Sequence, residues 1–234
     1  MYMVYITGDT HGDISRFSNE FMPKESEWTE NDYLIICGDF GFIFADDEED
    51  KELLDMLENK SYNILFVDGN HENFNALFEY PLEEWNGGKI HRIRKNIIHL
   101  MRGQCFTIEG QKFFTMGGAY SIDRFLRQKN ISYWDAEMPN GDEYREASET
   151  ILKSDKKFDY IITHTAPRMI IKYLGYYPDF HDMELTGYLE WVACSCDFKK
   201  WFFGHFHEDE TLLDGRFRAL YYDVERIGEC IDQA

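Results

Sequence analysis

Five short polar segments carry the residues of this sequence that are best suited to chemistry. They read Gly-Asp-Thr-His-Gly-Asp from residue 8, Gly-Asp-Phe-Gly from 38, Asp-Gly-Asn-His-Glu from 68, Thr-His-Thr-Ala-Pro from 163 and Gly-His-Phe-His-Glu-Asp from 204. Their side chains offer carboxylate oxygens, imidazole nitrogens and an amide oxygen, but no thiolate. This donor mixture suits Mn, Fe, Ni or Zn and poorly suits Cu(I) or an iron–sulfur cluster. The segments therefore indicate a metal site.

The candidate ligands outnumber what one tetrahedral ion needs. They are Asp9, His11, Asp39, Asn70, His164, His205 and His207. Two ions that share a carboxylate would use all of them, and a metal pair roughly 3.5–4 Å apart can hold a phosphoryl group and generate a hydroxide. Each residue alone has a plainer interpretation, since Gly-Asp is a common turn and Asn70 could cap a helix. The prediction rests on the recurrence of all five segments.

Each polar segment directly follows a short apolar run that is typical of a buried strand. These runs are residues 3–7, 33–37, 64–67, 160–163 and 200–203, and a sixth run at 112–116 has no such segment. Ligands of open α/β sheets collect at the carboxyl ends of strands. We therefore expect the five segments to converge on one site.

The remaining patterns predict an α/β layered fold. Helical periodicity covers residues 48–60, 143–153 and 183–193, and further strand candidates are 97–100, 104–108 and 216–222. Strands mixed with helices throughout favour two sheets with helices outside them. Neither a repeat nor a convincing linker divides residues 1–234, so we expect a single domain.

Composition narrows the function classes. The 24 basic and 44 acidic residues give a formal net charge of −20, which disfavours binding to long nucleic acid and leaves a small phosphorylated substrate as the expected partner. The opening apolar run is too short for a signal peptide, and no run reaches the length of a membrane span. Five scattered cysteines, at 37, 105, 194, 196 and 230, favour reduced thiols. We therefore expect a cytoplasmic protein.

In this order, the five segments resemble the signature blocks of the calcineurin-like metallophosphoesterases. The resemblance implies two mixed β-sheets sandwiched between helices, in four αββα layers, and two divalent transition metal ions, for which we expect Mn first and Fe, Ni or Zn as alternatives. It implies that His71 is the general acid that protonates the leaving group. The implied ligands are Asp9, His11 and His207 for the first ion, Asn70, His164 and His205 for the second, and Asp39 as the bridge.

The second block departs from the family pattern. Many members continue as Gly-Asp-x-x-Asp-Arg-Gly, but Phe42 and Ile43 stand at the second Asp and the Arg. In the phosphoprotein phosphatases this Asp orients the acid His and this Arg grips phosphate. A bidentate Arg matters most for a dianionic monoester, so the departure favours a diesterase slightly. Arg124 is the candidate replacement at the phosphate, and its alternative is an ion pair with one of the many surface acids.

These observations predict a phosphoester hydrolase in which a bridging hydroxide attacks phosphorus. The expected substrate is a small phosphomonoester or phosphodiester, either nucleotide-like or a phosphorylated metabolite. Aromatic residues in 125–140 and 172–182 either stack on a nucleobase or pin these loops to the core. Two alternative functions are a serine/threonine phosphoprotein phosphatase and a silent metal-binding scaffold, although a scaffold is expected to lose ligands and all of them are present.

Overall fold

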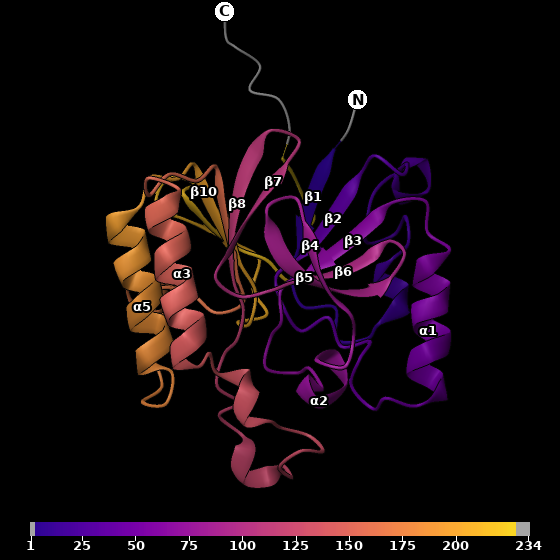
Figure 1. Cartoon of the computed structure of the whole chain (residues 1–234), viewed down its shortest axis with the longest axis horizontal. Coiled ribbons are helices and arrows are strands. Elements are labelled where there is room, and N and C mark those ends of the chain that lie inside the picture. Colours follow the sequence, from indigo (N-terminus) through magenta and orange to yellow (C-terminus); the bar gives the residue numbers. More distant parts are fainter. Residues whose placement is uncertain (1–2, 228–234) are drawn as a thin grey trace, which may run out of the picture.

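Two β-sheets pack face to face between two layers of helices in the computed structural model (Figure 1), which describes residues 3–227. Helix α1 (Glu48–Glu58) covers the outer face of one sheet, and helices α3 (Gly141–Lys153) and α5 (Met183–Ser195) lie side by side over the other. This order of layers confirms the predicted αββα fold. Cys230 lies outside the described residues.

The first sheet has the strand order β13-β1-β2-β3-β6-β5-β4. Strands β1, β2, β3 and β6 are parallel, so their carboxyl ends lie at one edge of the sheet. Strand β13 is antiparallel to β1, β5 is antiparallel to β6, and β4 is antiparallel to β5. The bounds are β1 Val4–Thr7, β2 Tyr33–Ile36, β3 Asn63–Phe66, β4 Leu82–Trp85, β5 Gly88–Arg94, β6 Ile97–Leu100 and β13 Glu225–Ile227.

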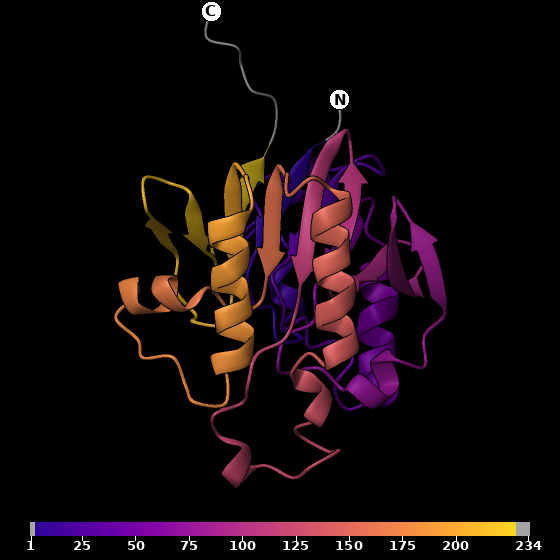
Figure 2. The same cartoon turned by 60° about the vertical axis from the view of Figure 1, so that its left-hand side comes forward.

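The second sheet has the order β11-β12-β10-β9-β8-β7, and its inner strands β12, β10, β9 and β8 are parallel. The bounds are β7 Gln104–Ile108, β8 Gln111–Met116, β9 Tyr160–Thr163, β10 Lys200–Phe203, β11 Glu210–Leu212 and β12 Phe217–Ala219. Two short helices complete the fold, α2 (Phe74–Leu77) and α4 (Arg168–Tyr173). Figure 2 shows α3 and α5 in front of this sheet and the segment after β8 projecting below it.

The core has three apolar layers, which explains why the strand-forming runs lack alternation. Residues such as Ile35, Val67 and Phe202 fill the space between the sheets, and separate clusters lie under the helices on each outer face. A strand that is buried on both faces reads as a continuous apolar run. This is why the predicted strands agree with β1, β2, β3, β8, β9 and β10 to within a residue or so at each end.

One hairpin escaped the sequence analysis. Strands β4 and β5 are joined by Asn86 and Gly87, with φ of 49° and 95°. Positive φ at both central residues is the requirement of a type I′ turn, and Asn-Gly is its strongest sequence signal. The strand β4 was not predicted because its two acidic residues and its half-exposed edge position mask the alternation.

Among residues 3–227, none of the helices combines the length and the apolar character needed to cross a bilayer.

Candidate metal centre and substrate cavities

The polar segments that follow β1, β2, β3, β9 and β10 meet at the carboxyl ends of these strands. Four side-chain donors from three of the segments, those of Asp9, His11, Asp39 and His207, lie within 4.8 Å of one another. Of the remaining predicted ligands, His164 contacts Asp9 and Asp39, Asn70 contacts His164, and the ring of His205 lies next to that of His164, with centroids 5.0 Å apart. The structure therefore brings all seven predicted ligands together.

The first group of donors is crowded around two imidazole nitrogens. Nε2 of His11 lies 2.9 Å from Nε2 of His207, and these atoms lie 3.8 Å from Asp39 Oδ2 and 3.5 Å from Asp9 Oδ2, respectively. Two imidazole nitrogens 2.9 Å apart repel each other unless a proton or a cation lies between their lone pairs. Burial lowers the pKa of His11 to about 4, so its ring is neutral and able to ligate at neutral pH.

The second group is built on the buried ring of His164. Its Nδ1 lies 2.8 Å from the carbonyl oxygen of Cys37, which can only accept, so Nδ1 carries a proton. The opposite nitrogen, Nε2, lies 3.0 Å from Asn70 Oδ1 and 3.4 Å from Asp39 Oδ1. Three acceptor atoms that face one another call for a positive charge among them. Burial disfavours the charged form of the His164 ring, but the attraction of the Asp39 and Asp9 carboxylates outweighs the effect of burial and raises the pKa of His164 to about 10.

The two carboxylates are fully buried and differ in what surrounds them. Burial raises the pKa of Asp9 to about 7, against the attraction of His164. Asp39 suffers the same burial, but His164, His71 and His11 together hold its pKa below the usual range. Buried carboxylates persist when they are paired or coordinate a cation. With imidazole nitrogens, an amide oxygen and two carboxylates, the donor set fits divalent transition metal ions.

Backbone strain supports this assignment. His11, Asp39, His205 and His207 are non-glycine residues in the left-handed region, with φ of 47°, 48°, 72° and 53°. Such conformations cost of order 1–3 kcal/mol each and gather at functional sites. Four of them among seven predicted ligands indicate that the loops are shaped to aim side chains at a common point.

Two glycines allow the carboxylates to approach the backbone. A Cβ on Gly204 would lie 2.1 Å from Asp9 Oδ1, and one on Gly69 would lie 2.1 Å from Asp39 Oδ1. Neither glycine has a positive φ, so the requirement for glycine here is one of space.

We predict that Gly204→Ala weakens metal binding by about 10–100-fold, because Asp9 must move away from the imidazoles of His164 and His207. Titration of the metal-free protein with Mn²⁺ by calorimetry measures this. Gly141→Ala is the matched control, since a Cβ there meets no atom within 4 Å. Equal Mn²⁺ affinity in the two variants would contradict the prediction.

His71, the predicted acid, is half-buried beside the cluster and covered by a guanidinium. Its backbone N–H donates to Asp39 Oδ1 at 2.8 Å. Arg127 places Nη1 3.3 Å from His71 Nδ1 and Nη2 3.0 Å from Nε2. A neutral imidazole can accept at only one of its nitrogens, so only one of these two contacts can be a hydrogen bond that the ring accepts. Burial lowers the pKa of His71, against the attraction of Asp39.

Arg127 was not among the predicted site residues. Its own position is fixed by Asp123 Oδ1 at 2.8 Å from Nε and by the carbonyl of Ser132 at 3.2 Å from Nη1. The only signal in the sequence was its place three residues after Arg124, and nothing in that spacing distinguishes the two arginines.

Arg124 lies elsewhere. Its guanidinium contacts the fully buried carboxylate of Glu137 at 2.9 Å and packs between the rings of Tyr120 and Tyr133, whose centroids lie 4.2 and 5.0 Å away. The structure therefore pairs Arg124 with an acid, as in the alternative for this residue, but this acid is buried and does not lie on the surface. Arg124 does not line the cavity next to the metal centre, so its contact with phosphate stays an untested prediction.

Phe42 and Ile43, which stand where many relatives have Asp and Arg, are buried in the apolar core. Glu72 stabilises the same loop, because its carboxylate accepts from the backbone N–H groups of Phe40 at 2.7 Å and Gly41 at 3.3 Å. Burial raises the pKa of Glu72 well above its usual value.

Asn70 does not cap a helix. Asn73 caps α2 instead, by accepting from the N–H of Ala76 at 3.2 Å. The Nδ2 group of Asn70 donates to Ser121 Oγ at 3.0 Å, which turns its Oδ1 toward His164. Ser121 in turn donates its backbone N–H to Glu137 at 3.2 Å, so the loop after β8 orients a metal ligand.

Two cavities border the centre and share His71. The larger, about 450 Å³, is here called the tyrosine cavity, because Tyr120, Tyr176 and Tyr177 line it together with Arg127 and four predicted ligands. The smaller, about 330 Å³, is called the Phe44 cavity, and it borders His11. Its other lining residues are Gly12, Gly41, Phe44, Ala45, Glu49, Asp50 and Leu53.

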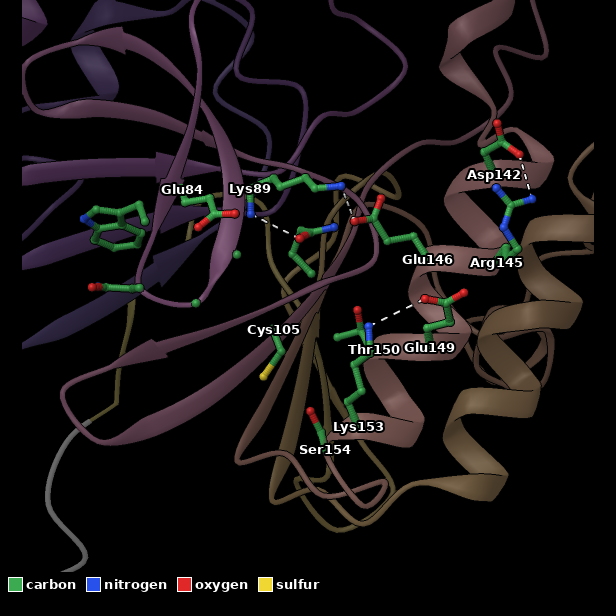
Figure 3. A pocket seen from close by; sticks show the side chains of 15 residues that line it. Glu84, Lys89, Cys105, Asp142, Arg145, Glu146, Glu149, Thr150, Lys153 and Ser154 are labelled. Atoms are coloured by element: carbon green, nitrogen blue, oxygen red, sulfur yellow. Dashed lines mark hydrogen bonds and ion pairs between the residues drawn. The ribbon is translucent and has the colours of Figure 1, made fainter.

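A still larger groove, about 860 Å³, lies away from the metal centre (Figure 3). It runs between the β4–β5 hairpin, β7 and α3. Its charged groups are paired with one another, including Lys89 with Glu146 at 2.6 Å and Arg145 with Asp142 at 2.9 Å. None of the predicted ligands lines it, so we do not assign the phosphoester to this groove.

Comparisons with known proteins agree with the geometry. Residues 2–209 match the family described as calcineurin-like phosphoesterase. A search of curated proteins found no match. Among solved structures, a putative 5'-nucleotidase from Staphylococcus aureus superposes with a TM-score of 0.51 at 13% identity, over 96% of this chain and 50% of that one. The phosphopantetheinyl hydrolase PptH from Mycobacterium tuberculosis gives a TM-score of 0.47 at 15% identity, over 94% of this chain and 90% of that one.

The present chain spans about half the length of the nucleotidase chain, and at 13% identity the likeness shows the fold alone. The match of the family to residues 2–209 covers most of the chain and includes all five polar segments. The protein is therefore a member of the calcineurin-like phosphoesterase family.

Proposed function

We propose that the protein hydrolyses a small phosphoester at a dinuclear centre. The observation that carries the proposal is the position of Asp39 between two donor groups. Its Oδ2 lies 3.8 Å from His11 Nε2 and its Oδ1 lies 3.4 Å from His164 Nε2. One ion would be held by Asp9, His11 and His207 and the other by Asn70, His164 and His205, with Asp39 shared. When bound, the ions supply Lewis acidity and an activated water.

In this proposal the protein's own side chains position the ester and handle the proton. His71 lies at the boundary of the two cavities, where it can donate a proton to the departing oxygen. Arg127 is the proposed contact for the non-bridging oxygens, in place of the predicted Arg124. Its contacts with the ring nitrogens of His71 also restrain that ring, so in this proposal a single arginine replaces both the Asp and the Arg missing from the second block.

The defining experiment measures metal content and turnover on the same sample. The purified protein, freed of metal and reloaded with Mn²⁺, should hold two ions per chain and hydrolyse p-nitrophenyl phosphate or bis(p-nitrophenyl) phosphate. Metal removal should abolish turnover, and reloading should restore it. A protein that holds two ions and cleaves neither ester would behave as the silent scaffold.

We predict that Arg127→Ala lowers kcat/KM by about 10–100-fold, mostly through KM, because a charged hydrogen bond to phosphate contributes about 1.5–3 kcal/mol. Arg127→Lys should restore little of the loss, since an ammonium lacks the planar, two-pronged donor geometry of a guanidinium. Steady-state kinetics on the Mn²⁺-loaded protein measure both variants.

Arg124→Ala is the matched control on the same loop. It leaves the buried Glu137 without its ionic partner, so we expect it to lower stability by about 3 kcal/mol and to change KM less than Arg127→Ala does. A larger KM effect for Arg124 would return the phosphate contact to that residue.

The cysteines support the proposal of a reducing, cytoplasmic location. Within residues 3–227 the thiols of Cys37, Cys105, Cys194 and Cys196 are free. All residues that we assign to the centre lie in one two-sheet body, which supports the proposal of a single domain.

A further inference from the structure

The protein has a separate space for each of two organic groups on phosphorus. The tyrosine cavity reaches the centre at Asn70, His205 and His207, whereas the Phe44 cavity reaches it at His11. Among residues 3–227, His71 alone lines both. Their volumes of about 450 and 330 Å³ fall in the range of sites for small ligands. We infer that the substrate of the proposed hydrolase is a small phosphodiester, with one organic arm in each cavity and the phosphorus beside His71.

The linings of both cavities suit organic groups. In the tyrosine cavity, Tyr177 is 92% exposed, so much of its ring is free to contact a ligand, and Tyr176 stacks on Phe206 with centroids 5.4 Å apart. In the Phe44 cavity, the side chains of Phe44, Ala45 and Leu53 provide apolar surface. A monoester has one organic arm and would leave one of the two spaces unused.

The charges around the centre give an independent reason to prefer a diester. A monoester is mostly dianionic at neutral pH and a diester carries one negative charge. Arg127 is the one lysine or arginine among the described residues that line either cavity, and Asp123 pairs with it at 2.8 Å. Asp179, Asp182, Glu49 and Asp50 add carboxylates to these linings. With one arginine against these carboxylates, the protein's own side chains do little to stabilise the second negative charge of a monoester.

The reaction balances with water alone. Water adds to phosphorus, the P–O bond to one arm breaks, and that arm leaves as an alcohol after His71 gives it a proton. The proton lost by the water restores His71, and the other arm remains on a phosphomonoester. Either arm can leave, because His71 borders both cavities.

A pair of esters with the same leaving group tests the inference. The Mn²⁺-loaded protein should cleave bis(p-nitrophenyl) phosphate with a kcat/KM at least ten times that for p-nitrophenyl phosphate. A preference for the monoester would overturn the inference and leave the proposed function intact. Failure to cleave either ester would count against the proposed function itself.

Binding provides a readout that needs no turnover. Diphenylphosphinate has two aryl arms and one negative charge and contains no ester bond, whereas phenylphosphonate has one arm. Calorimetry on the Mn²⁺-loaded protein should show tighter binding of diphenylphosphinate, by at least tenfold. Equal or weaker binding than phenylphosphonate would overturn the inference, whatever the esterase assay shows.

Filling the smaller cavity tests the role of each arm. Ala45 is exposed at the rim of the Phe44 cavity and has no assigned part in metal binding. Ala45→Trp should weaken diphenylphosphinate binding and lower the diester rate at least tenfold more than the monoester rate, whereas Ala45→Ser should change the ratio less than twofold. The two-arm assignment would be overturned if Ala45→Trp lowered the rates for both esters equally while its Tm and metal content stayed at the wild-type values. Ala45→Leu gives the same test with a smaller side chain if the tryptophan variant is unstable.

Discussion

Replacing His71 by Ala should lower kcat by roughly 10²–10⁴-fold on a phosphoester with an alkyl leaving group, because general acid catalysis contributes this much. An alkoxide is a poor leaving group and needs its proton as the P–O bond breaks. A nitrophenolate leaves without one, so the same variant should lose much less activity on bis(p-nitrophenyl) phosphate. The comparison of kcat for the two esters measures the effect.

Metal content separates this role from a structural one. His71 contributes its backbone N–H to Asp39, and an alanine keeps that bond, so the variant should still bind two ions. Similar losses on alkyl and aryl esters at full metal content would show that His71 positions the substrate and does not transfer a proton. Loss of one ion would show that the ring belongs to the metal ligands.

The convergence of the candidate metal ligands could be predicted from sequence because each of them follows the end of a strand. Asp9 and Asp39 follow β1 and β2, which are parallel neighbours, so an apolar run and the polar segment after it already place each carboxylate at one edge of the sheet. The positive φ of His205 and His207 could not be read in the same way, since glycine usually marks that region and here histidines occupy it.

The arginine at the site could not be predicted, for a physical reason. Arg124 and Arg127 lie on one short loop. Arg124 pairs with the buried Glu137, which lies 13 residues further along the chain, and Arg127 faces His71. Glu137 itself gave no sequence signal, since a lone glutamate in a polar stretch is normally exposed. Its burial follows from contacts with Ser121, Arg124 and Trp134 that exist only in the folded loop.

The two cavities could not be predicted from the sequence either. The tyrosine cavity is lined by residues 120–123, 127, 171, 176–179, 182 and 205–207, which follow β8, β9 and β10 of the second sheet, and by Asp39, Asn70 and His71, which follow β2 and β3 of the first. These segments approach one another only through the order of the strands and the packing of the two sheets. The Phe44 cavity depends on the loop that replaces the usual second block. Phe42 turns into the core there and Phe44 lines the cavity, although both were equivalent apolar residues in the sequence.

Replacing Asp39 by Asn should have the largest effect of all. The variant keeps the acceptor for the His71 N–H but loses the charge that both donor groups share. We expect the bound metal to fall from two ions to one or fewer and kcat to fall at least roughly 10³-fold, which corresponds to about 4 kcal/mol.

The thermal stability of the protein reports the same loss without turnover. Binding of Mn²⁺ at 100 times its Kd stabilises the wild type by about 2.7 kcal/mol. For a chain of this size, this should raise Tm by roughly 5–10 °C. In Asp39→Asn the rise should shrink, because the carboxylate that attracts both ions is gone.

Asp32→Asn is the matched control, since Asp32 is also a buried aspartate and lies just before β2, whereas Asp39 lies just after it. Asp32 accepts from the backbone N–H groups of Met3 and Thr29, so its loss should lower Tm without changing the rise caused by Mn²⁺. The two variants therefore separate the stability of the strand from the chemistry at its carboxyl end. If Asp39→Asn retains two ions and the full Mn²⁺-dependent rise, Asp39 does not bridge the metals, and the two donor groups must be joined in another way.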